Sequence, residues 1–97
     1  MSEIAYIKVI RKKGFYAMFR NFEILLNGQA AGKIARGQEV VFEVPPGIYT
    51  IQNKIDWLIT DPLELEVKAG ETATFQVSGK AKGGLNQEIF IQREVND

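Results

Sequence analysis

Hydrophobic and polar residues alternate along most of this chain, and a period of two residues is typical of β-strands. Residues 63–68 show the pattern most clearly, because leucine and valine alternate there with glutamate and lysine. Residues 72–77 repeat it, and residues 39–52 show it on both sides of Pro45-Pro46-Gly47. No stretch makes a convincing helix, so the pattern predicts an all-β protein.

The stretch from 39 to 52 predicts two strands joined by a tight turn. Pro46 fixes the backbone φ that the first central position of a turn requires. Gly47 follows and supplies the positive φ of a type II turn. We therefore expect the strands on either side of this turn to form a hairpin.

Asn27-Gly28 is the strongest short-range signal for a hairpin in the chain. It separates a strand over residues 22–26 from a strand over residues 29–34. The second of these carries mostly small side chains, which predicts a sheet edge. Residues 3–11 are apolar on both faces, which suits a central strand. The remaining strands are predicted at residues 48–57 and 88–94.

Residues 79–84 read Gly-Lys-Ala-Lys-Gly-Gly, a composition typical of a flexible linker. We therefore divide the chain into a sandwich domain over residues 1–78 and a C-terminal part over residues 79–97. The C-terminal part is expected to be this linker followed by a strand that joins the sandwich or swaps onto a neighbour.

Short strands that follow one another with turn signals every eight to twelve residues, roughly, are typical of a β-sandwich. Short connections favour antiparallel pairing. The inward-facing positions predict a core made of Ile7, Val9, Phe22, Ile24, Leu26, Val40, Phe42, Val44, Tyr49, Ile51, Leu63, Leu65, Phe75 and Val77.

Three motifs resemble a known family: Ile24-Leu25-Leu26-Asn27-Gly28 with Gly32, Phe42-x-Val44-Pro45-Pro46-Gly47-x-Tyr49, and Val67-x-x-Gly70-Glu71-x-x-x-Phe75. Together they resemble the PEGA-type family of small bacterial β-sandwiches, and more broadly the carboxypeptidase-regulatory-like and transthyretin-like sandwiches. The resemblance covers about residues 22–77. It implies a non-catalytic accessory role, and its motif positions form turns, so no catalytic residue is carried over. The predicted fold is a single antiparallel β-sandwich, immunoglobulin-like or transthyretin-like, of seven or eight strands.

Composition excludes several kinds of chemistry. The 97 residues include no cysteine and no histidine. Thiolate and imidazole metal sites, and catalysis by histidine or cysteine, are therefore impossible. We predict no catalytic residue, no cofactor and no metal, so we expect a protein that is not an enzyme. No signal peptide and no apolar run long enough for a membrane span is present, which predicts a soluble, cytoplasmic protein.

The charges are segregated although the formal net charge is zero. Residues 1–36 hold seven basic and two acidic residues, whereas residues 37–78 hold two basic and seven acidic residues. One interpretation is that strands of the two segments pair, so that opposite charges face each other across a sheet. The other is a dipolar molecule that stacks head to tail or offers a basic face to an acidic partner.

A cluster of basic and aromatic residues between the first two strands is the main candidate for an interaction surface. It consists of Arg11, Lys12, Lys13, Phe15, Tyr16, Met18 and Phe19. The apolar members are either an exposed patch or a lid that folds back onto the core, and lids are commoner in soluble monomers.

Trp57 is a second candidate, flanked by Asp56 and followed by Asp61. The two carboxylates beside an aromatic ring suggest a glycosidase pair or a sugar-stacking platform. The preferred interpretation is structural: Trp57 ends a strand and caps the core, and both aspartates lie in turns. A calcium site at these aspartates and Glu64 lacks the dense set of oxygen ligands that such sites use.

These observations favour a non-catalytic protein-interaction or structural accessory module. It would act through a sheet edge and the basic–aromatic cluster, with another protein or a second copy of itself as partner. The alternative is a ligand-binding module for nucleic acid or glycan that uses the cluster from Arg11 to Phe19, or Trp57. A sequence pI of about 6.3 makes nucleic acid the weaker partner.

Overall fold

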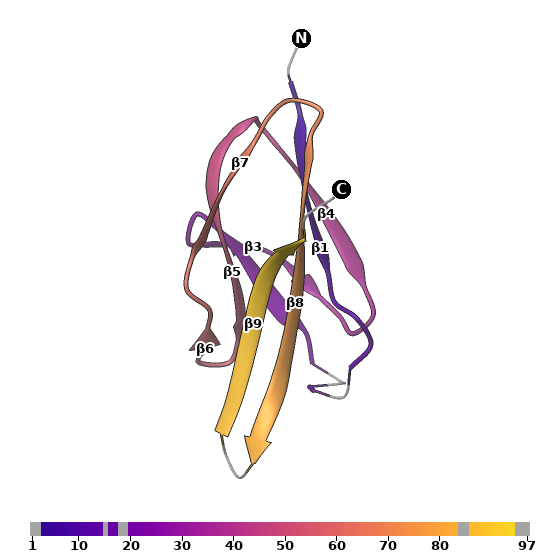
Figure 1. Cartoon of the computed structure of the whole chain (residues 1–97), viewed down its shortest axis with the longest axis vertical. Helices are drawn as coiled ribbons and strands as arrows, with labels where there is room; N and C mark the ends of the chain where they lie inside the picture. The colour runs from indigo at the N-terminus through magenta and orange to yellow at the C-terminus, as the bar shows by residue number, and fades with distance from the viewer. Residues whose placement is uncertain (1–2, 15, 18–19, 84–85, 95–97) are drawn as a thin grey trace.

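The computed structural model describes residues 3–14, 16–17, 20–83 and 86–94. Within them the chain forms β-strands and no helix (Figure 1). Nine strands are described, in place of the seven or eight expected. They are β1 (Ala5–Ile10), β2 (Phe22–Leu26), β3 (Gln29–Ile34), β4 (Glu39–Val44), β5 (Gly47–Ile55), β6 (Leu58–Ile59), β7 (Leu63–Val67), β8 (Thr72–Gly83) and β9 (Asn86–Glu94).

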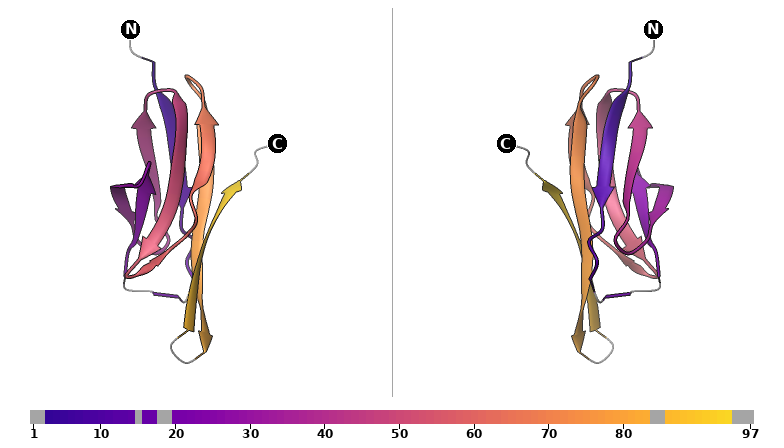
Figure 2. Two further views of the ribbon diagram at one scale, coloured as in Figure 1. Left: turned by 90° about the vertical axis from the view of Figure 1, so that its left-hand side faces the viewer. Right: turned by 90° about the vertical axis from the view of Figure 1, so that its right-hand side faces the viewer.

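The strands form two sheets that pack face to face, which confirms the predicted β-sandwich (Figure 2). The four-stranded sheet has the order β4-β1-β8-β9. The five-stranded sheet has the order β3-β2-β5-β6, and β7 also pairs with β5. Strand β1 lies between two neighbours, as its apolar faces predict, and β3 lies at an edge, as its small side chains predict.

The prediction of an all-antiparallel sandwich is wrong at one pair of strands. Strand β1 pairs parallel with β8, with Tyr6 opposite Thr72 and Ile10 opposite Gln76. Short connections do favour antiparallel pairs, and the hairpins β2–β3, β5–β6 and β8–β9 obey that rule. The rule for short connections does not apply to the parallel pair, because the whole five-stranded sheet lies between β1 and β8 in the sequence.

The hairpin predicted around Pro45-Pro46-Gly47 is also wrong. Strand β4 pairs with β1 in one sheet, whereas β5 pairs with β2 and β7 in the other. The turn therefore crosses from one layer to the other, and the apolar faces of β4 and β5 contribute to the core from opposite sheets. Gly47 does not adopt the positive φ that a type II turn would require.

The hairpin predicted at Asn27-Gly28 is confirmed. Asn27 has a φ of 53° and Gly28 a φ of 78°. Two consecutive residues with positive φ characterise the type I′ turn, whose twist matches that of the strands it joins. The side-chain amide of Asn27 also accepts a hydrogen bond from the backbone N–H of Thr50 in β5.

The flexible linker predicted over residues 79–84 is wrong for residues 79–83, which belong to strand β8. Strand β8 continues to Gly83 and pairs with β9, except for a register shift between Ala81 and Gly83. The β8–β9 hairpin extends past the rest of the sandwich, at the end away from the N-terminus (Figure 1). Strand β9 thus joins the sheet of its own chain, and exchange between chains stays a prediction.

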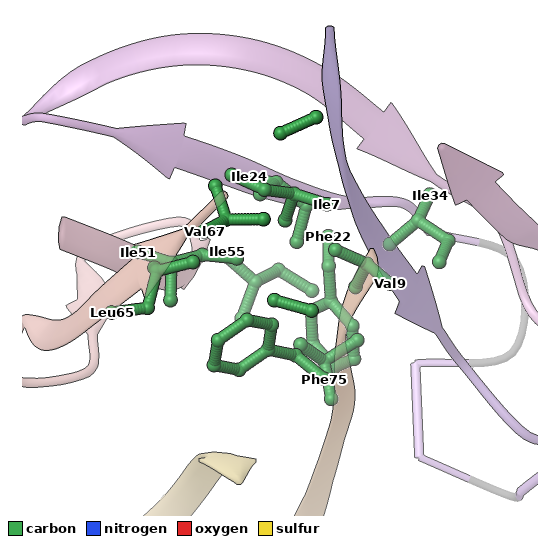
Figure 3. Close-up of a cluster of buried hydrophobic side chains, with 13 residues drawn as sticks. Ile7, Val9, Phe22, Ile24, Ile34, Ile51, Ile55, Leu65, Val67 and Phe75 are labelled. Atoms are coloured by element: carbon green, nitrogen blue, oxygen red, sulfur yellow. The ribbon is translucent and has the colours of Figure 1, made fainter. Parts of the chain in front are cut away.

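The core lies between the sheets (Figure 3). Most predicted positions are buried, and the rest of the predicted set is half-buried against them: Leu26, Val40, Phe42, Val44, Tyr49 and Leu63. Buried residues absent from the predicted core include Leu25, Ile34, Ile55 and Val67. Ile34 ends a strand of small side chains, and the polar Asn53 interrupts the apolar alternation before Ile55.

Opposite charges from the two charge-segregated segments pair across and between strands, as the first interpretation of the segregation predicts. Lys8 Nζ lies 2.9 Å from Glu39 Oε1 on the neighbouring strand. Arg20 forms an ion pair with Asp56. Among the described residues, no helix is long and apolar enough to cross a membrane.

Replacing Phe75 with Ala is expected to lower the free energy of unfolding by about 3–5 kcal/mol, because its ring is fully buried between the sheets. The half-buried Phe42 is the matched control, and Phe42→Ala is expected to cost clearly less. Urea denaturation of both variants measures the difference. Equal costs would contradict the placement of the core.

Candidate functional site

Arg11 is the most unexpected member of the predicted interaction cluster, because it is buried. Only 3 % of its surface is exposed. Burial lowers the pKa of Arg11, and the nearby positive charge of Arg36 lowers it further. The guanidinium still stays charged, since arginine does not lose its proton in proteins. A buried cation needs compensation from its surroundings.

Backbone carbonyl oxygens supply that compensation. Arg11 Nη1 donates hydrogen bonds to the carbonyls of Arg20 at 2.7 Å and Ile34 at 3.1 Å. Its Nη2 donates to the carbonyls of Tyr16 at 3.2 Å and Ala17 at 2.9 Å. The guanidinium carbon also lies 4.2 Å from the centre of the Phe22 ring, a cation–π contact.

Arg11 therefore holds the 12–21 loop against the end of β3, and the prediction that it belongs to an interaction surface is wrong. We name this arrangement the Arg11 clamp. A fork of five N–H donors on one rigid plane can bind several carbonyls at once, which lysine cannot do. The sequence does not distinguish the buried Arg11 from the two lysines that follow it, because all three carry the same charge.

The other members of the cluster lie in different surroundings. Lys12 and Lys13 are exposed, whereas Tyr16 is half-buried and packs against the core. The lid interpretation therefore holds for Tyr16, and its neighbour Ala17 packs in the same way. Three members, Phe15, Met18 and Phe19, lie outside the described residues.

Tyr16 ties the 12–21 loop to the β8–β9 hairpin. Its hydroxyl donates a hydrogen bond to Gln87 Oε1 at 2.6 Å. Its ring lies so close to Gly79 that a Cβ there would approach the ring to 2.6 Å. Glycine at this position therefore lets the ring lie flat on β8. Its ring also stacks on Phe22, with 6.1 Å between the ring centres.

A cleft opens between this loop and the hairpin, and we call it the end cleft. Its volume is about 520 Å³, and it is lined by Tyr16, Ala17, Arg20, Gly79, Lys80, Ala81 and Gln87. Burial raises the pKa of Tyr16, and the carboxylate of Asp56 raises it further. The hydroxyl is therefore a hydrogen-bond donor and not a base at neutral pH.

Asp56 belongs to an ion pair and not to a catalytic pair. Its Oδ2 accepts a hydrogen bond from Arg20 Nη1 at 2.6 Å, and its Oδ1 accepts one from Nη2. This hydrogen bonding lowers the pKa of Asp56 and raises that of Arg20. A carboxylate held ionised in this way cannot act as a general acid near neutral pH. Within the described residues, no group of acidic side chains could hold a metal ion.

Trp57 does not cap the core, contrary to the preferred interpretation of the sequence. It lies in the turn between β5 and β6, with 83 % of its surface exposed. Asp56 before it takes the positive φ, 53°, that this tight turn needs. Leu58, one residue on, packs toward the core instead.

A second opening runs along one flank of the sandwich, and we call it the side groove. It is lined by residues 59–63 on one side and residues 89–91 on the other, with a volume of about 420 Å³. Ile59 and Phe90 are large apolar residues in this groove with exposed fractions of 51 % and 37 %. The opposite flank is closed more tightly, because the Phe42 ring lies against Gly32.

Asn53 is buried beside the side groove and bonds to residues of both its walls. Its backbone N–H donates to Thr60 Oγ1 at 2.9 Å, and its Nδ2 donates to the Phe90 carbonyl at 3.2 Å. Its Oδ1 is buried and has no hydrogen-bond partner among the described residues. Such an acceptor carries a desolvation cost that a donor from a bound molecule would remove.

The structure thus separates two members of the predicted basic–aromatic cluster, since Arg11 is internal whereas Tyr16 lines the end cleft. Trp57, the second candidate, projects from a turn. The sequence did not indicate the residues of the side groove. Only an apolar run at Ile89, Phe90 and Ile91 hinted at them, because the groove arises where two edges of different sheets meet.

Replacing Arg11 with Met is expected to lower the free energy of unfolding by about 3 kcal/mol or more, because the buried carbonyl of Ile34 and the part-buried carbonyls of Tyr16 and Arg20 lose a charged donor. Lys12→Met, one residue on and exposed, is the matched control and should change it by less than about 0.5 kcal/mol. Urea denaturation measures both. An Arg11→Met variant as stable as the control would contradict the Arg11 clamp.

Asp56→Asn removes the charge of the Arg20–Asp56 pair but keeps a residue that tolerates positive φ. The folded-state pKa of Asp56 lies below its unfolded value, so the pair stabilises the fold above the unfolded pKa. That contribution is lost as pH falls through the folded pKa. The wild-type Tm is therefore expected to exceed that of the variant at pH 7, and the difference should shrink as the pH falls below the ordinary pKa of aspartate. A difference that is independent of pH would contradict this account.

Comparison with known proteins identifies no relative: no protein-family model, no curated protein and no solved structure matches the chain. The resemblance to PEGA-type sandwiches therefore stays a prediction from the three motifs.

Proposed function

We propose that this protein is a non-catalytic protein-interaction module that binds an extended segment of its partner in the side groove. The observation that carries the proposal is the groove itself, with Ile59 and Phe90 exposed on facing walls. Exposed large apolar residues that line a common hollow are typical of protein-binding surfaces. Tryptophan is the residue type most enriched among binding hot spots, and Trp57 projects two residues before Ile59.

An extended segment suits the groove better than a globular surface does. The walls belong to edge strands of the two sheets, β6 and β7 on one side and β9 on the other. An edge strand offers unpaired backbone donors and acceptors that a further strand can satisfy.

The non-catalytic part of the proposal is supported by the chemistry of the available side chains. The chain has no histidine and no cysteine, and Asp56 is engaged by Arg20. The phenol of Tyr16 holds its proton more tightly than usual. These groups suit binding and positioning, and none of them is prepared for proton transfer or nucleophilic attack.

The burial of Arg11 weakens the alternative of a nucleic-acid ligand. Phosphate binding depends on exposed cations. Of the basic residues proposed for it, Lys12 and Lys13 remain exposed, but Arg11 does not. In the end cleft, Arg20 is already neutralised by Asp56. The exposed Trp57 remains suited to stacking on a sugar ring, yet a single aromatic gives a small platform.

Selection of random linear peptides on the immobilised protein tests the proposal. We expect it to yield peptides with alternating apolar residues, because only one face of an added strand meets the groove. Ile59→Glu should weaken their binding about tenfold or more, since it places a charge in the apolar wall. Fluorescence anisotropy with a labelled selected peptide measures the Kd.

Val41→Glu is the matched control. Val41 lies on β4, with 55 % of its surface exposed, close to the 51 % of Ile59, but it does not line the groove. This variant should bind the peptide as the wild type does. Failure to select any peptide, or equal binding by the Ile59→Glu variant, would rule out the proposed function.

A further inference from the structure

We infer that the segment occupying the side groove is strand β9 of a second copy of this chain, paired antiparallel with β9 about a twofold axis at Phe90. This inference rests on the function proposed above and names its partner. The pairing would join two four-stranded sheets into one continuous sheet across the dimer.

Strand β9 is the edge whose centre lacks the usual protection against pairing, since its charged residues Glu88, Arg93 and Glu94 flank that centre. Proteins guard edge strands with charged residues and prolines. The β3 edge carries Lys33 and small residues that offer little contact area. The β4 edge carries two glutamates, and β7 carries two more and follows a proline. At the centre of β9 stands Ile89-Phe90-Ile91, with no charge and no proline.

The backbone of β9 directs hydrogen-bonding groups outward at this centre. The Phe90 carbonyl accepts a hydrogen bond from Asn53 in the other sheet, so it points away from β8. The N–H and C=O of one residue in an antiparallel strand point to the same side. Phe90 and, two residues on, Gln92 therefore face the open edge. A carbonyl has two lone pairs, so the bond from Asn53 leaves Phe90 able to accept another.

The sequence of β9 is complementary to itself in one register. With Phe90 opposite Phe90 of the second copy, Ile89 lies opposite Ile91, and Glu88 lies opposite Gln92. Two aromatic rings meet on the outer face, a favourable cross-strand pair. No like charges lie directly opposite each other in this register.

Two other registers pair less favourable side chains. A twofold axis at Ile91 places Glu88 opposite Glu94 of the second copy, which sets like charges against each other. An axis at Gln92 places Phe90 opposite Glu94 and Ile91 opposite Arg93, so that charges meet apolar side chains. The formal net charge of zero adds no long-range repulsion between copies.

The shape of the molecule fits the same arrangement. The chain measures 52 × 23 × 23 Å, and the β8–β9 hairpin projects beyond one end of the sandwich (Figure 1). The C-terminal end of β9 leans away from the sandwich (Figure 2). In an antiparallel pair, the projecting part of each β9 would lie along the leaning part of the other. The inward-facing Ile89 and Ile91 of the second copy would then cover the side groove.

Opposite charge changes at Gln92 test both the partner and the register. Gln92 is exposed, and its neighbour on β8 is the uncharged Gln76, so neither change should disturb the hairpin. Sedimentation equilibrium of the wild type is expected to show a monomer–dimer equilibrium. Glu88 already forms a long ion pair with Lys80 of its own hairpin, at 4.0 Å. Gln92→Lys would add a second cation beside Glu88 of the second copy, and should lower the dimer Kd about three- to tenfold, because two symmetry-related contacts form. Gln92→Glu should raise it by a similar factor.

Gln29 provides the matched control, since it is an exposed glutamine on the β3 edge. Gln29→Lys and Gln29→Glu should leave the dimer Kd unchanged. A wild type that stays monomeric, or a dimer with the same Kd in both Gln92 variants, would overturn the inference. If peptides are still selected through Ile59 in either case, the proposed function stands with a different partner. If they are not, both fall.

Discussion

The buried guanidinium of Arg11 is the interaction on which one end of this sandwich depends. A cation without water must be solvated by the protein, and here backbone carbonyls of the 12–21 loop and of β3 do so. If the loop left, the guanidinium would lose three of its four carbonyl partners, and if Arg11 left, those carbonyls would lose this donor. Tyr16, set in place by this loop, reaches the β8–β9 hairpin and forms one wall of the end cleft.

The two flanks of the sandwich differ, and this difference decides where a partner can bind. On the flank of β3 and β4, Gly32 lets the Phe42 ring come close and close the gap between the sheets. On the flank of β6, β7 and β9, no side chain among the described residues plays the same part. The side groove remains there, with a buried amide oxygen of Asn53 unsatisfied beside it. One flank of the sandwich is thus closed by a side chain of its own, whereas the other is open to a partner.

Local patterns predicted the strands of this fold well, because alternation and turn residues act within a few positions. Asn27-Gly28 forms its hairpin, and the alternating residues of β7 and β8 face the core as expected. The local pattern at Pro45-Pro46-Gly47 did not predict how this turn is used in the fold. A short turn between apolar strands serves a hairpin or a crossing between layers equally well, and the choice depends on β1 and β2, which are distant in sequence.

The candidate site was less predictable for the same reason. Arg11 and Lys12 are equivalent as charges in the sequence, and only the backbone carbonyls that the fold brings close to Arg11 distinguish them. The side groove depends on β6 and β9, which no motif connects. The residues of the side groove form one surface only through the order of the strands.

The parallel pair β1–β8 also affects how the molecule is made. Strand β1 is separated from its neighbour β8 in the sequence by the whole of the other sheet. Pairing between segments so distant in sequence slows folding, because the entropic cost of closing a long loop comes before the contacts form. Until β8 is in place, β1 has an unpaired edge and an apolar face. That edge is a site at which the incompletely folded chain can aggregate.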